Sequence, residues 1–481
     1  MRILLDGQVI DAANVPATTT VLEYLRDTLH RTGTKEGCAE GDCGACTIVL
    51  GELSATGDRI EYKPVNSCIR YLPTIDGREL ITVESLQNKD SLHPVQQSMV
   101  DQHASQCGFC TPGFVMSLFG LYLEETAPGR DDVIGALAGN LCRCTGYRPI
   151  VDAGCSMNRY PEPSHWSRSD AQSTSRKDAL RSLQRTSSLK LPDFVAPQTM
   201  DELASILVSA PDSLVLAGGT DIGLWTTKQL KTLPKIVYLG EVRELKQISL
   251  AEDQLSIGAA VTLSDAWKTI VHHYPTLKDL ARRFASPPVC NSGTLCGNIA
   301  NGSPIGDSMP ALIALGATIE LRRGVQTRSL PLEDFYLGYQ RKDLQPGEFV
   351  VRVTVPLPRS QQLLACYKIS KRFDQDISAV CGAFCVEIQD EKVISARIAF
   401  GGMAPIPKRA VRTEQSLIGK AWDSNTIDAA VETLEAEFQP LSDMRASAAY
   451  RLESAGNLLR KFHRASQGES ALSVHELAVM S

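Results

Sequence analysis

The sequence predicts an α+β chain of several domains, and three observations predict it. The first is length, because 481 residues would fill three or four domains of roughly 100–200 residues each. The second is composition, since 43% apolar and 22% charged residues are typical of folded globular chains and exclude extended disorder. The third is the cysteine distribution. Nine of the fourteen cysteines fall within the first 155 residues, which predicts a separate chemistry for that part.

Charge and hydropathy exclude two classes of partner. The formal net charge of −6 gives no basic field, so a nucleic-acid partner is not expected. No apolar run reaches the ~18–20 residues of a membrane span, so no membrane partner is expected either. The apolar start at Ile3–Leu5 ends at once in Asp6, which is too short for a signal peptide. A cytoplasmic location is therefore expected.

Residues 1–82 predict a small β-grasp-like domain. Apolar runs on both sides of Asp6-Gly7 predict a hairpin over residues 3–10. The threonines at 18–20 offer an N-cap to a helix with a regular apolar face. A Gly- and Cys-rich loop at 37–46 then leads into a strand at 47–50, and another short strand is expected at 80–83.

Residues 83–158 predict a helical bundle. Pro94, Pro112 and Pro149 each stand where a first helical turn would begin, a position that tolerates proline. Apolar spacing supports three helices, whose faces are Leu92, Val95, Met99; Phe114, Leu118, Tyr122; and Val133, Leu137, Leu141. The cysteine pairs lie at helix ends, so they are expected to gather at one end of the bundle.

The remaining chain predicts a linker and two α+β domains. Residues 159–190 are rich in Ser, Arg and Lys, which favours a solvated tether over a contact with a partner chain. Residues 191–364 form the next predicted domain, with strands at 213–217, 236–239, 255–257, 317–321 and 349–355. Residues 365–481 form the last, with strands at 380–386 and 396–400 and helices at about 425–437 and 445–465.

The first cysteine set is Cys38-x4-Cys43-x2-Cys46, completed by the distant Cys68. This spacing is typical of a plant-type [2Fe–2S] site, in which one tight loop supplies three thiolates. The glycines inside the loop let backbone N–H groups turn toward the cluster sulfurs. Zinc is the alternative, but zinc sites favour two separated short cysteine knuckles.

The second set is Cys107-x2-Cys110 followed by Cys142-x-Cys144. A C-x-C step suits two thiolates near a pair of irons better than one tetrahedral zinc ion, although spacing alone leaves zinc open. A redox C-x-x-C is a third alternative, which the absence of a thioredoxin-like pattern disfavours. The other six cysteines have no partner at ligand spacing and are expected to be buried structural thiols: Cys155, Cys290, Cys296, Cys366, Cys381 and Cys385.

Two glycine-rich segments, 217–223 and 292–299, follow in the middle of the chain. Neither is a Rossmann or P-loop motif. Consecutive glycines after a strand can present N–H groups to a phosphate, but an ordinary tight turn fits the spacing equally well.

Three long motifs together resemble a known family. EGCAEGDCGAC at 36–46, QCGFCTPG at 106–113 and NLCRCTGYRP at 140–149 resemble the two [2Fe–2S] signatures of the molybdenum hydroxylase (xanthine oxidase) family. The resemblance implies a ferredoxin-like domain, an all-α [2Fe–2S] domain, a vanillyl-alcohol-oxidase (PCMH-type) FAD domain and a C-terminal flavoprotein domain. In the family, the cluster of the helical domain lies nearer the molybdenum and the ferredoxin-like one nearer the flavin.

The same resemblance assigns FAD contacts. It implies that residues 215–222 hold the pyrophosphate, that Thr294 and Asp307 bind polar groups of FAD, and that Phe284 and Val350 flank the flavin ring. Residues 371–376 resemble the mobile loop where NAD approaches. Gly-Gly-Thr-Asp at 218–221 replaces the Gly-Asn-Thr-Glu of animal members, whose mobile loop is also more charged. The full implied set is Val215, Leu216, Ala217, Gly218, Gly219, Thr220, Asp221, Ile222, Phe284, Thr294, Gly297, Asn298, Asp307, Val350 and Lys368.

The order of cluster, cluster and flavin resembles the small subunit of bacterial xanthine dehydrogenases. The resemblance implies that a molybdopterin-binding partner chain oxidises hypoxanthine or xanthine, in an (αβ)2 heterotetramer. Electrons would then pass through both clusters to FAD and on to NAD, and no residue of this chain would act as a catalytic base on the purine. Two alternatives remain: a subunit of an aldehyde or N-heterocycle dehydrogenase, or a stand-alone metal-binding or electron-transfer protein.

Overall fold

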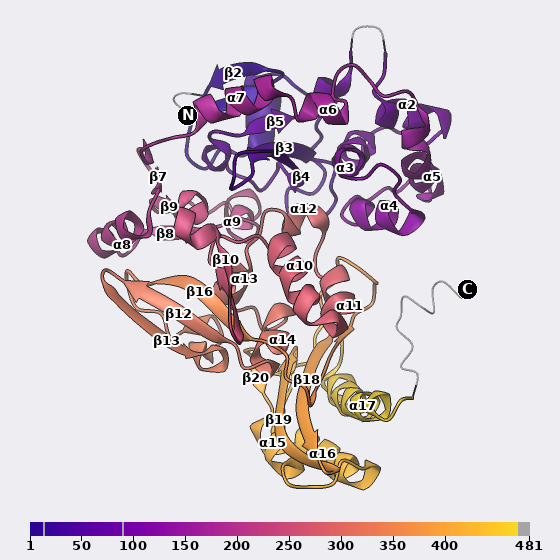
Figure 1. Cartoon of the computed structure of the whole chain (residues 1–481), viewed down its shortest axis with the longest axis vertical. Helices are drawn as coiled ribbons and strands as arrows, with labels where there is room; N and C mark the ends of the chain where they lie inside the picture. The colour runs from indigo at the N-terminus through magenta and orange to yellow at the C-terminus, as the bar shows by residue number, and fades with distance from the viewer. Residues whose placement is uncertain (13–14, 89–90, 470–481) are drawn as a thin grey trace. The chain divides into compact units, whose positions relative to one another are not determined.

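The computed structural model describes residues 1–12, 15–88 and 91–469, and within them the chain forms two compact units (Figure 1). Unit 1 consists of residues 1–199, 212–242 and 285–293, and unit 2 of residues 200–211, 243–284 and 294–481. Both contain helices and sheets, which confirms the multidomain α+β class.

The N-terminal part of unit 1 is a five-stranded sheet in the order β2-β1-β5-β3-β4. The predicted hairpin is confirmed, with Leu5 paired to Gln8 across the Asp6-Gly7 turn. The predicted N-cap is confirmed as well, because the Thr20 hydroxyl accepts from the Glu23 N–H at 3.1 Å. The sequence analysis did not anticipate β4. The strands are β1 (Arg2–Leu5), β2 (Gln8–Asp11), β3 (Thr47–Leu53), β4 (Ile60–Asn66) and β5 (Glu79–Ile81), and the helix is α1 (Val21–Glu23), which continues as a π-helical turn over Tyr24–Thr28.

Four helices follow in unit 1 and lie together beside this sheet (Figure 1). Pro94 and Pro112 stand in the first turns of α2 and α3, as predicted. Val133 and Leu137 are buried on α4, but Leu141 lies beyond the end of that helix and is 42% exposed, so its predicted place on the apolar face is wrong. The helices are α2 (Pro94–Asp101), α3 (Thr111–Glu124), α4 (Arg130–Leu137) and α5 (Arg148–Ser156).

The segment predicted as a solvated tether is instead folded and packed. It contains α6 (Arg168–Ala171) and α7 (Thr174–Leu183), which lie against the N-terminal sheet. Trp166 is 1% exposed, and the Tyr62 hydroxyl donates to the Ala171 carbonyl at 2.7 Å. Tertiary contacts of a few side chains therefore override the polar composition of this segment.

A second, four-stranded sheet of unit 1 has the order β6-β7-β9-β8. Strand β8 runs parallel to β9 and delivers the chain into the first glycine-rich segment, which leads to helix α9. The elements are β6 (Leu189–Leu191), β7 (Phe194–Ala196), β8 (Leu214–Leu216), β9 (Ile236–Tyr238), α9 (Ile222–Thr227) and α12 (Pro287–Cys290).

Unit 2 begins with an antiparallel five-stranded sheet in the order β10-β11-β16-β12-β13. The strands predicted at 255–257, 317–321 and 349–355 are all found here. The strands are β10 (Ile248–Ala251), β11 (Gln254–Gly258), β12 (Thr318–Arg323), β13 (Gln326–Pro331) and β16 (Phe349–Pro356), with a small pair β14 (Tyr336–Gly338) and β15 (Arg341–Lys342). The helices are α8 (Met200–Ser209), α10 (Leu263–His273), α11 (Lys278–Arg282), α13 (Leu295–Asn301) and α14 (Ser308–Ala314).

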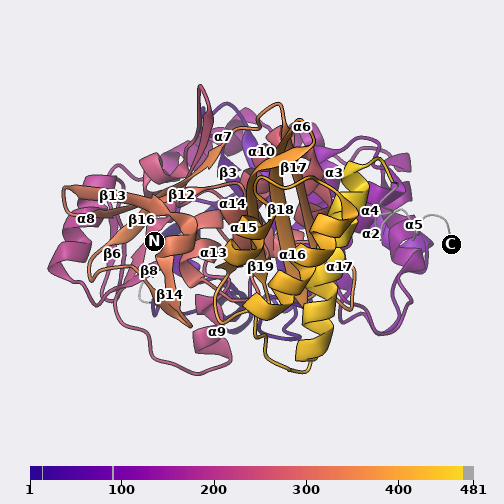
Figure 2. The ribbon, with the colours of Figure 1, turned by 90° about the horizontal axis from the view of Figure 1, so that it is seen from below.

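The C-terminal part of unit 2 is a four-stranded sheet covered on one face by helices (Figure 2). Along its long central strands, apolar residues that point into the core alternate with other residues. Phe384 and Phe400 are two of these apolar residues, and the centroids of their rings lie 5.7 Å apart. The predicted strand pair and both predicted helices are confirmed. The elements are β17 (Gln362–Ile369), β18 (Val380–Gln389), β19 (Lys392–Gly401), β20 (Lys408–Arg409), α15 (Val411–Leu417), α16 (Ser424–Glu437) and α17 (Ala448–Ser466). Residues 470–481 of the predicted domain lie outside the described residues.

None of the helices in the described ranges combines the length and the apolar character that a membrane crossing requires.

Candidate redox centres

The four thiols of the first set meet in the ferredoxin-like part of unit 1. Three come from the loop before β3 and the fourth, Cys68, follows β4, so the β3–β4 pairing brings them together. The Cys46 and Cys68 sulfurs lie 3.2 Å apart, and both side chains are buried. Backbone N–H groups of Glu40, Asp42 and Cys43 each point to the Cys38 sulfur at 3.4 Å. The expected wrapping of the loop around its sulfurs is therefore present.

Hydrogen bonding polarises this first set. The pKa of Cys38 lies far below its ordinary value, first because the Cys43 and Cys68 thiols donate to it and then because backbone N–H groups add to them. The pKa values of Cys43 and Cys68 are raised correspondingly, since both act as donors to Cys38. Such a set of close sulfurs with N–H donors fits the thiolate ligation of an iron–sulfur cluster.

The four thiols of the second set meet at the end of the helical bundle. The Cys107 and Cys144 sulfurs lie 3.6 Å apart and are exposed. Cys142 accepts from both the N–H and the hydroxyl of Thr145, at 3.4 and 3.2 Å. Partial burial is the largest influence on the pKa of Cys142 and raises it, but the hydrogen bonds of Thr145 together leave it below its ordinary value.

In both sets the thiols approach one another as neighbours. Within the described parts of the chain, no three His, Cys, Asp or Glu side chains surround a single ion position.

The loops that carry the two sets are directly hydrogen-bonded to each other. The Leu141 N–H donates to the Cys43 carbonyl at 2.9 Å, and the Asn140 amide donates to the Gly44 carbonyl at 3.1 Å. A Cβ atom at Gly113 would lie 2.1 Å from that same Gly44 carbonyl, so only glycine permits this approach. Cys43 and Cys142 are therefore joined through the backbone of Leu141 and its hydrogen bond to the Cys43 carbonyl.

The first glycine-rich segment forms a tight loop after β8. A Cβ atom at Gly218 would lie 1.9 Å from the Ser292 carbonyl, so the two glycine-rich segments meet where only glycine fits. A Cβ atom at Gly223 would lie 2.5 Å from the carbonyl of Ile69, the residue after the ligand Cys68. Of the predicted pyrophosphate residues, Val215 and Leu216 end β8 and Ile222 begins α9, which leaves 217–221 as the loop.

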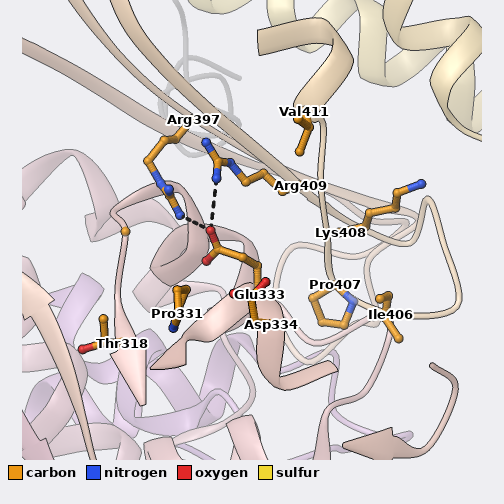
Figure 3. A pocket seen from close by; sticks show the side chains of 11 residues that line it. Thr318, Pro331, Glu333, Asp334, Arg397, Ile406, Pro407, Lys408, Arg409 and Val411 are labelled. Atoms are coloured by element: carbon orange, nitrogen blue, oxygen red, sulfur yellow. Dashed lines mark hydrogen bonds and ion pairs between the residues drawn. The ribbon is translucent and has the colours of Figure 1, made fainter. Parts of the chain in front are cut away.

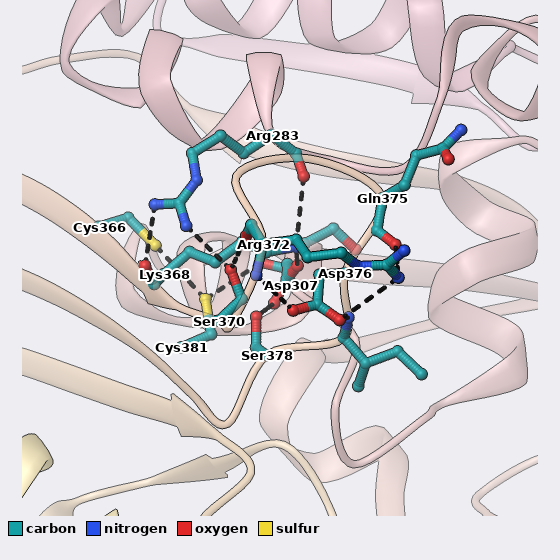
Figure 4. A network of polar contacts seen from close by, with 12 residues as sticks. Arg283, Asp307, Cys366, Lys368, Ser370, Arg372, Gln375, Asp376, Ser378 and Cys381 are labelled. Carbon is teal, nitrogen blue, oxygen red and sulfur yellow. Dashed lines mark hydrogen bonds and ion pairs between the residues drawn. The ribbon is translucent and has the colours of Figure 1, made fainter. Parts of the chain in front are cut away.

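Several predicted flavin residues of unit 2 belong to one buried polar network (Figure 4). The Lys368 ammonium donates to Asp307 at 2.7 Å and to the Arg283 carbonyl at 3.2 Å. Ser378 donates to the other Asp307 oxygen at 2.5 Å. Phe284, directly after Arg283, is 8% exposed. The structure thus brings together Phe284, Asp307 and Lys368.

The other predicted flavin residues of unit 2 have separate local roles. Thr294 caps α13, where its hydroxyl accepts from the Gly297 N–H at 3.0 Å. Asn298 accepts from the Ser308 hydroxyl, and Val350 is 7% exposed on β16. Whether any of these groups contacts FAD stays a prediction.

Arg283, which the sequence analysis missed, anchors the segment predicted to approach NAD. Its buried guanidinium donates to the carbonyls of Lys368 and Phe373 at 2.9 and 3.0 Å and to the Ser370 hydroxyl at 3.0 Å (Figure 4). No motif in the sequence marks this arginine, because its partners are mostly backbone atoms almost ninety residues away.

A cavity of about 520 Å³ in unit 2 contains none of the predicted site residues (Figure 3). At its centre one Glu333 oxygen accepts from Arg397 at 2.7 Å and from Arg409 at 3.2 Å. Arg409 also donates to Glu414 at 2.9 Å. These ion pairs link β19 and β20 to the segment after β13, so they have a structural role.

The six cysteines without ligand spacing form no disulfide. Five are buried, as predicted, and burial raises the pKa of Cys290 to about 12. Cys155 is only partly buried, which corrects the prediction for that residue.

The chain matches four described domain families in succession. Residues 3–72 match a 2Fe-2S iron-sulfur cluster binding domain, and residues 82–155 match a [2Fe-2S] binding domain. Residues 187–358 match the FAD binding domain in molybdopterin dehydrogenase, and residues 365–466 match the CO dehydrogenase flavoprotein C-terminal domain. Two [2Fe–2S] domains and an FAD-binding domain are thus present.

Curated relatives include xanthine dehydrogenases. That of Emericella nidulans is 32% identical over 91% of this chain, and xanthine dehydrogenase 1 of Arabidopsis thaliana is 30% identical over 88% of it. In both cases the match covers 36% of the relative. The chain therefore spans little more than a third of the length of these relatives.

Solved structures with a similar fold include two other enzymes. A Cu,Mo-CO dehydrogenase shares a TM-score of 0.52 and 27% identity over 56% of this chain and 95% of the other. Quinoline 2-oxidoreductase from Pseudomonas putida 86 shares a TM-score of 0.52 and 29% identity over 58% of this chain and 99% of the other.

Proposed function

The chain belongs to the molybdenum hydroxylase family, and on that premise we propose that it is the electron-transfer subunit of a xanthine dehydrogenase. It would receive electrons from a molybdenum cofactor on a partner subunit and deliver them to NAD. The partner would oxidise hypoxanthine and xanthine to urate. The xanthine dehydrogenase relatives support this choice of substrate.

One observation carries the proposal: two sets of four thiols whose loops are hydrogen-bonded to each other. When bound, two [2Fe–2S] clusters and FAD together transfer single electrons and collect them in pairs. We assign the first cluster to Cys38, Cys43, Cys46 and Cys68, and the second to Cys107, Cys110, Cys142 and Cys144. The chain's own contribution is to fix both thiol sets rigidly and close together through the Leu141–Cys43 hydrogen bond.

The helical thiol set is proposed to face the partner. Its two outer thiols, Cys107 and Cys144, are exposed, and so are the apolar side chains of Phe109, Leu141 and Tyr147. An apolar surface around a redox centre indicates a surface that another protein covers. The ferredoxin-like set is less exposed, with Cys46 and Cys68 buried and Cys38 and Cys43 partly buried.

The flavin is proposed to bind through residues 215–222 and through the Asp307–Lys368 network, each described above within its own unit. The segment 371–376, held by Arg283, is proposed to meet NAD. The resemblance of this segment supports NAD as the acceptor, and the experiment below tests the acceptor directly.

The test is to purify the chain with its co-expressed partner under anaerobic conditions. We expect four iron, four sulfide and one FAD per copy of this chain, two distinct EPR signals after reduction, and an (αβ)2 assembly. Hypoxanthine and xanthine should bleach the visible spectrum, and NAD should restore it. A colourless complex containing zinc would contradict the assignment of both thiol sets.

A second candidate is the corresponding subunit of another molybdenum hydroxylase. The fold similarity to quinoline 2-oxidoreductase and CO dehydrogenase supports this second candidate. Bleaching by an aldehyde or an N-heterocycle, with no response to xanthine, would decide for this candidate. Under both candidates the thiol and flavin assignments are the same.

A further inference from the structure

Within unit 1, Arg70 places a guanidinium beside Ser292 and the first glycine-rich segment. It lies two residues after the cluster ligand Cys68, and its Nη1 donates to the Ser292 hydroxyl at 3.3 Å. Its Nε is enclosed and has no hydrogen-bond partner. The loop at Gly218 packs directly on the Ser292 carbonyl, so the arginine lies next to the proposed pyrophosphate loop.

A second arginine of the same domain, Arg78, differs from Arg70 in having carboxylate partners. Arg78 is more deeply buried than Arg70, and it pairs with Glu52 at 3.1 Å and with Glu241 at 3.0 Å. An enclosed guanidinium nitrogen without a hydrogen-bond partner is costly, which indicates that Arg70 is placed for an anion.

The surroundings select a phosphate group as that anion. Arginine presents a planar fork of donors that matches phosphate oxygens, and adjacent glycine backbone can add N–H donors. We propose that Arg70 binds the pyrophosphate of FAD, so that a residue of the ferredoxin-like domain completes the flavin site. The proposal rests on the proposed assignment of residues 215–222 to the pyrophosphate, and it adds a ligand from outside the segment matched as FAD-binding.

Such a contact links the two redox centres physically. Cys68 holds the first cluster, Ile69 packs under the glycine loop, and Arg70 meets the phosphate, so three consecutive residues join cluster and flavin sites. The flavin would then be retained only when the ferredoxin-like domain is folded against the loop.

The test compares Arg70→Met and Arg70→Lys in the purified complex. After removal of bound flavin, the binding of FAD, ADP and riboflavin is measured by titration. We expect Arg70→Met to weaken FAD and ADP binding about tenfold or more and to leave riboflavin binding unchanged, because only the first two carry the pyrophosphate. Arg70→Lys should retain part of the affinity. Iron content and both EPR signals should stay at the wild-type level.

The matched control is Arg59→Met, an exposed arginine of the same unit whose loss should change none of these values. Unchanged FAD and ADP affinities in Arg70→Met would overturn the proposal, and a shifted midpoint potential of the ferredoxin-like cluster in that variant would assign the arginine to the cluster charge instead. A wild-type complex with iron but no flavin would overturn the flavin assignment itself, which separates the two failures.

Discussion

Thr145 donates two hydrogen bonds to the sulfur of Cys142, one of the proposed cluster ligands. Hydrogen bonds to ligand sulfurs stabilise the reduced, more negative cluster and so raise its potential. Thr145→Val removes only the hydroxyl donor. We expect the potential of the helical cluster to fall by about 20–60 mV, which corresponds to roughly 0.5–1.5 kcal/mol for one electron. EPR-monitored redox titration measures the shift, with the ferredoxin-like signal as internal control. An unchanged potential would mean that this hydroxyl does not tune the cluster.

Replacement of Cys142 itself has a larger and selective effect. Cys142→Ser should remove one of the two EPR-distinct clusters and reduce iron from four to two per chain, since each set holds its own pair of irons. The other signal should persist because its four thiols are untouched. Loss of both signals would contradict two independent sites.

Asp307 combines a proposed flavin contact with a buried ion pair. Asp307→Ala leaves the Lys368 ammonium enclosed without its carboxylate, a change that typically costs about 3–5 kcal/mol. We therefore expect both a lower unfolding temperature and loss of FAD, with iron content unchanged. The flavin-to-iron ratio and thermal unfolding measure the two effects. Asp334→Ala, at an exposed carboxylate of unit 2, is the control. A wild-type flavin-to-iron ratio in Asp307→Ala would refute the flavin assignment.

At the scale of elements, α7 illustrates a docking interaction based on charge. Arg176 on α7 reaches Glu79 of β5 at 2.5 Å, and Glu79 is fully buried. Burial raises the pKa of Glu79, against the opposing effect of Arg176. Arg176→Met should destabilise unit 1 by about 3–5 kcal/mol at neutral pH, because the carboxylate loses its partner.

The pH dependence of this variant follows from the raised pKa of Glu79. An acid whose folded-state pKa exceeds its unfolded value binds protons more readily when folded, so stability falls as pH rises between the two values. The deficit of Arg176→Met should therefore shrink as pH is lowered toward the ordinary glutamate range. Chemical denaturation at several pH values measures it. Arg181→Met, in an exposed pair with Asp178, should cost nothing measurable, and Glu79→Gln combined with Arg176→Met should remove the pH dependence.

The same helix explains where sequence reasoning failed. The periodic and capped elements were predictable, such as the hairpin at Asp6-Gly7 and the helix capped by Thr20, because their signals are local. Residues 159–190 were misjudged because α6 and α7 are short and polar, and their order depends on contacts of Trp166 and Arg176 with residues far away in sequence. The composition of a segment does not predict contacts with residues that are distant in sequence.

The residues of the candidate site also fall into two groups, those that the sequence predicts and those that it does not. The gathering of the eight thiols in two sets was predictable from the cysteine spacing together with the three motifs, and their role as cluster ligands stays a prediction. Arg70 and Arg283 were not predictable, since each acts through single contacts with backbone or hydroxyl groups of distant segments. Leu141 was assigned to a buried helical face by periodicity alone, although α4 ends before it.

At the scale of the whole molecule, the exposed side of the helical thiol set is the surface that we propose contacts the partner chain. Leu141 is 42% exposed there, and its backbone N–H donates to the Cys43 carbonyl of the neighbouring cluster loop. Leu141→Glu should therefore leave both clusters intact while placing a charge in the proposed apolar interface, where an unpaired charge costs several kcal/mol and weakens association by about 10²-fold or more. Co-purification with the molybdenum subunit and iron content measure the two outcomes. Val9→Glu, an exposed apolar residue on β2, is the control and should not affect assembly. If Leu141→Glu assembled normally with full iron, the partner would have to dock elsewhere, and the proposed entry of electrons at Cys107 and Cys144 would be wrong.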